Sequence, residues 1–326
     1  MAKKRLNLLV RYSGINMEVL KETNFTNLGK KKTGKVRDIY DAGDKLILIT
    51  TDRHSSFDRI IAHVPHKGQV LNQVSAWWFE QTKNIVPNHV LAIPDPNVTV
   101  GKKMSMVPVE AVMRGYLTGV TDTSIWTRYQ KGQRKFGDLS LEEGLKKNIK
   151  LPMPVFDPTT KEDVHDRAIS PGEMMAEGLI TQELFNKVRE TATKLFLRGQ
   201  EIAVSRGLIL VDTKYEFGTD QSGNLVLIDE IHTPDSSRYW QVEGYEESLA
   251  QGSEPKSFDK EFLRLWFKDN CDPYKDAVLP EAPGELVVEL SKRYIQMYEQ
   301  ITGEKFVPGE QPIIPRMQRN LKSYAI

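Results

Sequence analysis

Residues 208–218 of the chain are Leu-Ile-Leu-Val-Asp-Thr-Lys-Tyr-Glu-Phe-Gly, an apolar run that continues into alternating charged and uncharged side chains. Successive side chains on a β-strand point to opposite faces, so Asp212, Lys214 and Glu216 share one face of a predicted strand. Three charges on a strand that begins with four aliphatic residues form a poor solvent face and a good ligand-binding face. A turn at 218–224 and a second apolar run at 225–231 complete a predicted β-hairpin.

This hairpin carries two carboxylates that can bind one divalent cation. Mg²⁺ commonly takes one or two protein carboxylates together with phosphate oxygens, and Glu216 and Asp229 can supply them across the hairpin. That requires a register in which both side chains point the same way, and the sequence does not fix the register. A surface hairpin with Lys–Glu cross-strand pairs explains the same spacing. Both interpretations remain open from the spacing alone.

Outward from this hairpin, the remaining pattern mixes strands and helices without regular alternation, which favours the α+β class. A first hairpin is predicted at 34–40 and 45–51. The predicted helices are 70–83, a helix beginning at Ser170-Pro171 with a capping box to Glu173, 182–206, 259–268 and 284–301. Residues 131–163 are predicted to form long connections with a short helix at most. A lobe boundary near residue 105 divides the chain into lobes 1–105 and 106–326.

The composition limits the function classes. The 326 residues are enough for about two domains. Lys and Arg total 45 against 44 Asp and Glu, a balance that argues against a nucleic-acid-coating protein. The single cysteine, Cys271, cannot form an internal disulfide, and no apolar run approaches the length of a membrane span. We therefore expect a soluble, cytoplasmic protein with no membrane or nucleic-acid partner.

Two further motifs contain positively charged side chains. Lys35 and Arg37 follow Gly34 on one face of the first hairpin, and such a strand can lie over a triphosphate, although a solvated basic strand is the simpler interpretation of this motif alone. Glu110 and Arg114 are four apart and share a face on either a helix or a strand. Arginine is suited to planar, bidentate recognition of carboxylate or phosphate.

Three polar segments remain. Residues 232–240 contain two serines and Arg238, which fits an anion site or a polar surface loop. Residues 52–58 form a dense polar loop directly after an apolar strand, where functional loops often lie. His165 and Asp166 have no further His or Cys at ligand spacing, so a zinc site is rejected. No nucleophile motif indicates covalent catalysis. Together the residues indicate an enzyme that binds anions and a divalent metal, and nucleotide-dependent chemistry fits.

Two of these motifs resemble the signatures of one family. Residues 210–218 and residues 107–114, which are followed by Thr118-Gly119, resemble the two signatures of the SAICAR synthetases (phosphoribosylaminoimidazole-succinocarboxamide synthases) of purine biosynthesis. Residues 34–38, 52–58 and 229–238 are similar to that family as well, in the same order, from about residue 25 to 300. In one departure, Val120 stands where the family has Ser, and Ser124 follows four residues later, as if 120–123 were inserted. The tail beyond Phe306 has no counterpart.

The resemblance implies a fold and a reaction. The implied fold has two α+β lobes, the first like that of protein kinases, with ATP in the cleft between them. The implied reaction joins 5-aminoimidazole-4-carboxylate ribotide (CAIR) and L-aspartate, with ATP converted to ADP and phosphate. A carboxylate is a poor acylating agent, so ATP first converts it to an acyl phosphate, which the aspartate amine attacks. Catalysis of this kind is mostly positioning and charge neutralisation.

The same resemblance assigns the nucleotide ligands. Lys35 and Arg37 contact the ATP phosphates, Glu216 and Asp229 hold the nucleotide Mg²⁺, and Lys214 lies near the transferred phosphoryl group.

It also assigns the substrate ligands. Glu110 and Asp166 are candidates for a metal near the CAIR carboxylate. The residues implied to bind CAIR are Arg114, Ser124, Asp212, Asp235 and Arg238, with Asp212 also a catalytic candidate beside Lys214. The residues implied to lie in a loop near the substrates are Ser55, Ser56 and Asp58.

Two alternatives are kept. A phosphotransferase of the same fold needs ATP and Mg²⁺ but not aspartate, although the protein-kinase motifs His-Arg-Asp and Asp-Phe-Gly are absent. A non-catalytic RNA-binding protein would use residues 3–5 and 30–32, with binding that weakens steeply with salt. Whether the chain is a monomer or a homo-oligomer stays open.

Overall fold

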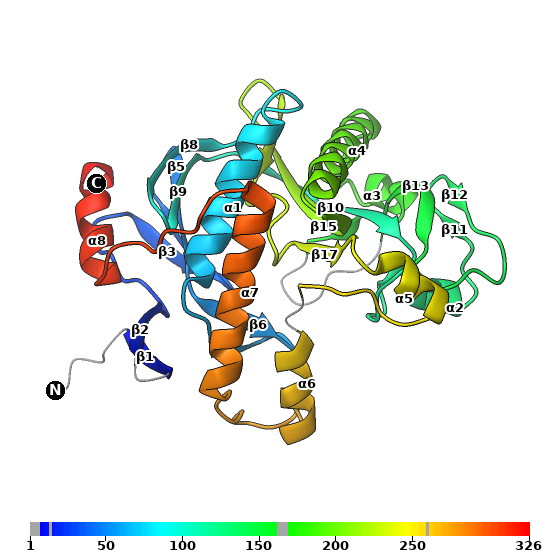
Figure 1. The fold of residues 1–326 in the computed structure, drawn as a ribbon. Helices are drawn as coiled ribbons and strands as arrows, with labels where there is room; N and C mark the ends of the chain where they lie inside the picture. Colours follow the sequence, from blue (N-terminus) through cyan, green and yellow to red (C-terminus); the bar gives the residue numbers. More distant parts are fainter. Residues whose placement is uncertain (1–6, 13–14, 162–168, 259–260) are drawn as a thin grey trace. The chain divides into compact units, whose positions relative to one another are not determined.

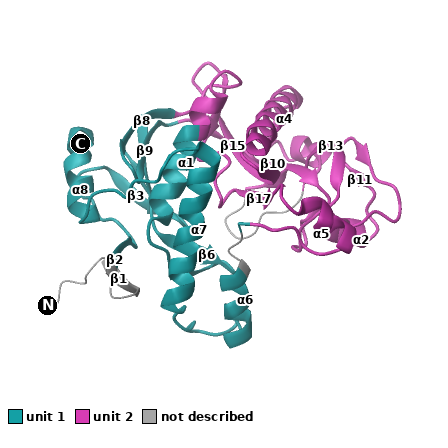
Figure 2. Cartoon of the chain, in the orientation of Figure 1, with its two compact units in different colours: residues 1–77, 90–103, 258–326 teal, residues 78–89, 104–257 magenta. Residues whose placement is uncertain are grey.

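The computed structural model describes residues 7–12, 15–161, 169–258 and 261–326 (Figure 1). The chain divides into two compact units (Figure 2): unit 1 comprises residues 1–77, 90–103 and 258–326, and unit 2 comprises residues 78–89 and 104–257. The predicted boundary near residue 105 falls beside the border at 103/104. The C-terminal stretch 258–326 groups with unit 1, however, so the division is not a single cut along the sequence.

Unit 1 is built on a five-stranded antiparallel sheet. Its strands, in spatial order, are β3 (Lys30–Thr33), β4 (Arg37–Asp41), β5 (Lys45–Thr50), β9 (Val98–Lys102) and β8 (Val90–Asp95). Two separate hairpins, β1 (Asn7–Tyr12) with β2 (Ile15–Leu20) and β6 (Arg53–Ser56) with β7 (Arg59–His63), accompany it. The first predicted hairpin corresponds to β4 and β5, and the predicted helix 70–83 is confirmed as α1 (Lys67–Thr82).

The C-terminal stretch completes the core of unit 1. Helices α6 (Glu261–Asn270) and α7 (Gly284–Thr302) confirm the two predicted helices, but α8 (Ile313–Asn320) and the short 3₁₀ turn η1 (Lys322–Tyr324) follow without having been predicted. Ile313 and Met317 of α8 pack in one apolar cluster with strand residues such as Ile47. The buried Arg316 guanidinium forms two hydrogen bonds to the Asp95 carboxylate, at 2.9 and 3.0 Å.

Unit 2 is built on a sheet with the strand order β13-β10-β15-β16, in which β14 also pairs with β10 and β17 with β15. The strands are β10 (Ser105–Tyr116), β13 (Lys150–Phe156), β14 (Thr159–Thr160), β15 (Leu208–Thr219), β16 (Leu225–Ile228) and β17 (Ser237–Gln241). The predicted hairpin 208–231 is therefore present, although β16 ends at Ile228. Asp229, with φ of 64°, turns the chain out of the strand.

Helices frame this sheet. Helix α4 (Gln182–Ser205), predicted at 182–206, lies against β15 and β10 (Figure 1) and buries one face that includes Phe196 and Gly199. The capping box predicted at Ser170 and Glu173 begins α3 (Pro171–Ala176). Helix α5 (Tyr245–Gln251) was not predicted. No helix in the described part of the chain is long and apolar enough to span a membrane.

The prediction for residues 131–163 was wrong. Its described part, residues 131–161, contains β11 (Lys135–Phe136), β12 (Leu139–Ser140), β13 and β14 and no helix, since α2 (Ile125–Gln130) ends before it. Pro152 and Pro154 lie within β13 and obscure the strand in the sequence. An edge strand tolerates proline because one row of its N–H groups needs no partner, and β13 is at the edge of its sheet.

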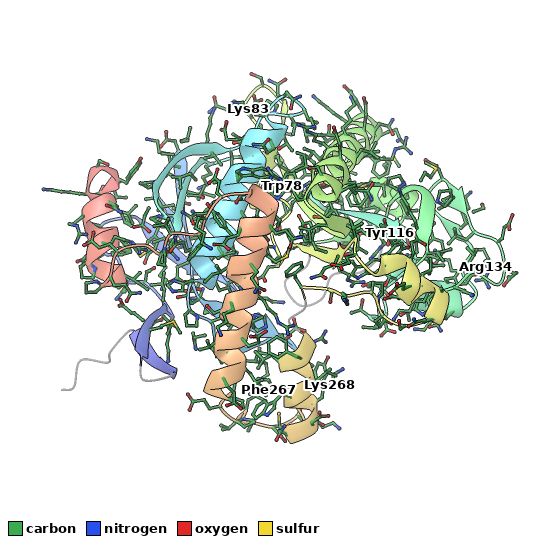
Figure 3. All side chains as sticks on the ribbon, viewed as in Figure 1. Trp78, Lys83, Tyr116, Arg134, Phe267 and Lys268 are labelled. Atoms are coloured by element: carbon green, nitrogen blue, oxygen red, sulfur yellow. The ribbon has the colours of Figure 1, made fainter. Side chains whose placement is uncertain are left out.

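The uncharged face of β15 contacts a buried histidine. Tyr215 is fully buried, and its hydroxyl lies 2.5 Å from Nε2 of His232. The imidazole packs edge-on against Trp78, which is labelled in Figure 3, with 4.7 Å between ring centroids. Burial lowers the pKa of His232 to about 3.

This shift predicts a pH-dependent stability. The unfolded chain protonates His232 near pH 6.5 and the folded chain does not, so the contribution of His232 to stability falls as pH decreases below 6.5. The variant His232→Gln lacks this pH-dependent contribution to the free energy of unfolding, whereas the other titrating groups contribute equally in both proteins. We expect the stability advantage of the wild type to shrink by about 1 kcal/mol between pH 6.5 and 5.5 in urea unfolding, because the unfolded histidine is already half protonated at pH 6.5. A difference in unfolding free energy that is independent of pH would contradict the buried, neutral imidazole.

Candidate functional site

The two long strands of unit 2 align their charges on one face of the sheet. In the antiparallel pair β10–β15, Glu110 is opposite Glu216 and Arg114 is opposite Asp212, with Lys214 between them. Residues directly opposite in an antiparallel pair share a face. On the other edge of β15, Arg238 of β17 is opposite Asp212. Glu110 and Arg114, for which the sequence left helix and strand open, therefore lie on a strand.

One end of this charged face is acidic. Lys214 Nζ lies 2.5 Å from Oε1 of Glu110 and 3.7 Å from Oε1 of Glu216. Lys161 forms an ion pair with the other carboxylate oxygen of Glu216. Asp229, directly after β16, adds a further negative charge close enough to act on both Glu216 and Lys214. Three carboxylates thus share two ammonium groups.

The pKa shifts at this end show that the ammonium groups compensate the carboxylate charges only in part. Burial, followed by the nearby charge of Asp229, raises the pKa of Glu216, and the ammonium groups of Lys161 and Lys214 offset this only in part. Burial by itself would lower the pKa of Lys214, but the charges of Glu110 and Glu216 outweigh it and raise that pKa above its ordinary value. The negative charge of Glu216 is thus only partly compensated, and a cation would stabilise it.

The other end of the face is basic. Nε of Arg114 donates to Oδ2 of Asp157 at 2.5 Å, and Arg128 forms an ion pair with the same oxygen. Arg238 lies 3.6 Å from Oδ2 of Asp212. In these pairs three guanidinium groups face two carboxylates, an arrangement suited to an anionic ligand.

Ser124 is buried and caps helix α2. Its hydroxyl donates to the carbonyl oxygen of Thr121 at 2.7 Å and accepts from the backbone N–H of Thr127. A Cβ on Gly119, which has φ of 104°, would overlap the Ser124 side chain, so the loop 120–123 brings Ser124 back against the Thr118-Gly119 pair. Arg114 also donates to the carbonyl oxygen of Thr123 at 3.0 Å. Ser124 therefore lies close to Arg114, although residues 120–123 separate it from Gly119 in sequence.

The residues predicted in unit 1 gather at two turns. Residues 52–58 were expected to form a loop, but β6 begins at Arg53, and Phe57 and Asp58, both with φ of 55°, form the tight turn to β7. Ser55 and Ser56 are therefore strand residues. Asp58 at this turn pairs with Lys35 at 2.8 Å, and both side chains are exposed. An exposed pair of this kind contributes little to stability, so Lys35 can exchange Asp58 for another anion.

The remaining predicted residues are placed as follows. Arg37 is the first residue of β4, opposite Thr50. Asp235 lies in the turn between β16 and β17, where its backbone N–H donates to Thr233 Oγ1 at 3.3 Å. Asp166 lies outside the described residues. Within unit 2, Asp212, Lys214, Glu216, Glu110, Arg114 and Arg238 are brought onto one face; Lys35 and Asp58 meet within unit 1.

Sequence reasoning missed three residues of this face: Lys161, Asp157 and Arg128. Asp157 and Lys161 are placed by strands β13 and β14, in the stretch that was predicted to form connections, and Arg128 reaches Asp157 from helix α2. No local sequence pattern marks Lys161, because its contact with Glu216 depends on the pairing of Thr159 opposite Glu110.

A mixed α/β fold whose central strands carry an acidic end and a basic end on one face is suited to bind anions together with a cation. The sequence profile described as SAICAR synthetase matches residues 30–280. A phosphoribosylaminoimidazole-succinocarboxamide synthase of Legionella pneumophila (strain Lens) is 59% identical over 300 residues, which cover 91% of this chain and 96% of the relative. The chain belongs to the SAICAR synthetase family.

Solved structures agree with this assignment. A SAICAR synthase from Saccharomyces cerevisiae, complexed with SAICAR, matches with a TM-score of 0.75 at 31% identity and covers 88% of this chain and 99% of its own. A SAICAR synthetase in complex with ADP matches with a TM-score of 0.64 at 27% identity, covering 86% and 100%. The predicted family, the ligase class and the mixed α/β fold are confirmed.

Proposed function

We propose that this protein joins CAIR and L-aspartate into the succinocarboxamide ribotide (SAICAR), with ATP converted to ADP and phosphate. Family membership at 59% identity supports the reaction. The observation that carries the residue assignment is the bipolar face of unit 2, with carboxylates crowded at one end and guanidinium groups at the other.

The acidic end fits a divalent cation. Burial, and after it the negative charge of Asp229, raises the pKa of Glu216, so two carboxylates lie close together at this end. Mg²⁺ accepts this kind of oxygen donor set and completes its shell with phosphate oxygens. We assign Glu216 and Asp229 to the nucleotide Mg²⁺, which would neutralise the transferring phosphate. Glu110, with Asp166 as the second candidate, is assigned to a metal beside the CAIR carboxylate.

The chemistry requires two displacements. An oxygen of the CAIR carboxylate attacks the γ-phosphorus of ATP, and the bond to ADP breaks. The aspartate amine then attacks the acyl carbon, loses a proton, and inorganic phosphate leaves. Lys214, held between two carboxylates on the sheet face, is assigned to the transferring phosphoryl group, whose negative charge it stabilises. Asp212 is assigned to the substrate beside it.

The basic end is assigned to CAIR. Arg238 is exposed enough to reach a ligand, with 39% of its side chain accessible, and is assigned to the ribotide phosphate. Arg114 is held by Asp157 and is assigned to CAIR as well. Ser124 and Asp235 are the remaining CAIR ligands in this proposal.

Both units contribute to the nucleotide in this proposal. Lys35 and Arg37 of unit 1 are assigned to the ATP phosphates, and Ser55, Ser56 and Asp58 to a segment near the substrates. A kinase-like first lobe and ATP bound between the lobes belong to the same proposal, as does a cytoplasmic location.

The test is ADP release by the purified protein with Mg-ATP, CAIR and aspartate, omitting each substrate in turn. We expect ADP formation to require both CAIR and aspartate. ADP formation without aspartate would favour a phosphotransferase or an uncoupled first step. Absence of ADP under every combination would contradict the ligase proposal for this chain and revive a binding function.

A further inference from the structure

The turn that carries Lys35 is held from inside unit 1 by a single arginine. Arg53 begins β6, and only 8% of its side chain is exposed. Its Nε donates to the carbonyl oxygen of Lys35 at 3.1 Å, and one Nη donates to that of Gly34 at 3.1 Å. The other Nη donates to the carbonyl oxygen of Lys21 at 2.7 Å. Arg53 therefore binds two consecutive carbonyl groups of the turn.

The next carbonyl group of the turn also points inward. The oxygen of Val36 accepts from the backbone N–H of Thr51 at 2.9 Å and from its hydroxyl at 2.8 Å. Gly34 closes the turn by donating its N–H to the carbonyl oxygen of Arg37 at 2.8 Å. Three consecutive carbonyl oxygens, those of residues 34, 35 and 36, are thus bound by donors on the segment 51–53.

The stereochemistry of the peptide bond sets where the N–H groups of this turn point. In a trans peptide the C=O and the following N–H point in opposite directions. The N–H groups of Lys35 and Val36 therefore point away from the Arg53 guanidinium. Successive N–H groups on the outer side of a turn form a concavity for anions, and Lys35 adds a mobile ammonium group. A reversed peptide would instead present a carbonyl oxygen to the phosphate and repel it.

The guanidinium of Arg53 is fixed on its other side. It lies 3.0 Å from Oδ1 of Asp38, a fully buried carboxylate. The other oxygen of Asp38 accepts from the backbone N–H of Thr23 at 2.6 Å and pairs with Lys31 at 3.1 Å. Arg53 is thus neutralised by a protein carboxylate and occupied by protein carbonyl oxygens, so it acts on the turn and not directly on a ligand.

We propose that Arg53 is a positioning residue for ATP: by binding the carbonyl oxygens of Gly34 and Lys35, it keeps the N–H side of the turn toward the nucleotide phosphates. This inference rests on the proposed function, in which Lys35 and Arg37 contact those phosphates. If Arg53 has this role, replacing it should weaken the binding of ATP more than the binding of adenosine, which has no phosphate.

The test compares the full-length wild type with Arg53→Lys. A lysine at 53 cannot serve three carbonyl oxygens and a carboxylate together, because its donors lie on one atom. Calorimetric titration with ATP, ADP and adenosine separates phosphate binding from base binding. We expect Arg53→Lys to weaken ATP binding about tenfold and to leave adenosine binding within about twofold, with KM for ATP raised and KM for CAIR unchanged.

A matched control lies in the same hairpin. Arg59 also donates to backbone carbonyl oxygens, those of Pro273, Asp276 and Ala277, and none of these belongs to the 34–36 turn. Arg59→Lys should therefore retain the preference for ATP over adenosine. Where Arg53→Lys fails to fold, Thr51→Val removes one donor to Val36 and should show a smaller loss of the same preference.

The outcomes separate this inference from the proposed function. A wild type that does not bind ATP more tightly than adenosine overturns the proposed function, and this inference with it. A wild type with that preference, together with a folded Arg53→Lys (or Thr51→Val) that keeps it in full, overturns the positioning role alone. Equal losses in Arg53→Lys and Arg59→Lys also overturn it, because a general loss of structure then explains both.

Discussion

Glu216→Gln is expected to lower the rate of ADP release at least about 100-fold at saturating CAIR and aspartate, because it removes one charge from the proposed magnesium site. Glutamine keeps the size of the side chain but not its negative charge. The loss should be largest at low Mg²⁺ and partly recovered as Mg²⁺ is raised. Initial rates measured across a magnesium titration test this directly.

A control variant separates this effect from a general loss of charge. Glu190 is exposed on α4, where it forms an ion pair with the exposed Lys194 at 2.7 Å. Glu190→Gln should leave the rate unchanged. Because Glu216 is buried and pairs with Lys161, urea unfolding of both variants must accompany the kinetics. A folded Glu216→Gln that turns over normally at low Mg²⁺ would remove Glu216 from the metal site.

Gly199→Ala is expected to lower the free energy of unfolding by about 2 kcal/mol. A Cβ at Gly199 on α4 would lie 2.3 Å from Cε1 of His232 and 2.7 Å from a methyl group of Leu210, and both neighbours are buried. Overpacking of this kind costs about 3 kcal/mol, whereas replacing a helical glycine by alanine recovers only about 1 kcal/mol. The steric overlap therefore outweighs the gain in helix propensity, and the net change in the free energy of unfolding is destabilising.

Gly172→Ala provides the comparison. Gly172 is also helical, on α3, but a Cβ there meets no atom within 4 Å. This variant should be neutral or slightly stabilising. Urea unfolding of the two variants side by side measures the difference, and a Gly199→Ala protein as stable as Gly172→Ala would show that His232 can move without cost.

Secondary structure can be predicted best from this sequence where one hydrophobic periodicity extends over a long segment. The alternation from Asp212 to Phe217 is observed in β15, where Tyr215 and Phe217 are fully buried and the charged residues lie on the opposite face. Helix α4 follows its predicted bounds to within one residue because its apolar positions recur over 24 residues and Gly207 ends the pattern. These elements are encoded locally.

Which residues form the candidate site depends on contacts between segments that are far apart in the sequence. Whether Glu110 and Arg114 lie on a helix or a strand depends on pairing with β15, more than 90 residues away in sequence. The contact of Lys161 with Glu216 depends on β14 and β10, and no pattern near Lys161 specifies it. Helix α8 was missed for a related reason: its buried positions are defined by the sheet of unit 1, and Arg316 looks in sequence like a solvent-exposed charge.

The contribution of α8 to the core has a consequence for synthesis on the ribosome. Unit 2 is almost continuous in sequence and can close its sheet once residue 257 has left the exit tunnel. The sheet of unit 1 is translated before that of unit 2, yet its apolar cluster lacks Met317 and Leu321 until residues 313–321 are made. Nascent domains fold as their contacts become available. The sheet of unit 1 therefore precedes unit 2 in synthesis but completes its core after it, and chains released before residue 313 would carry an exposed apolar sheet for quality-control proteases to recognise.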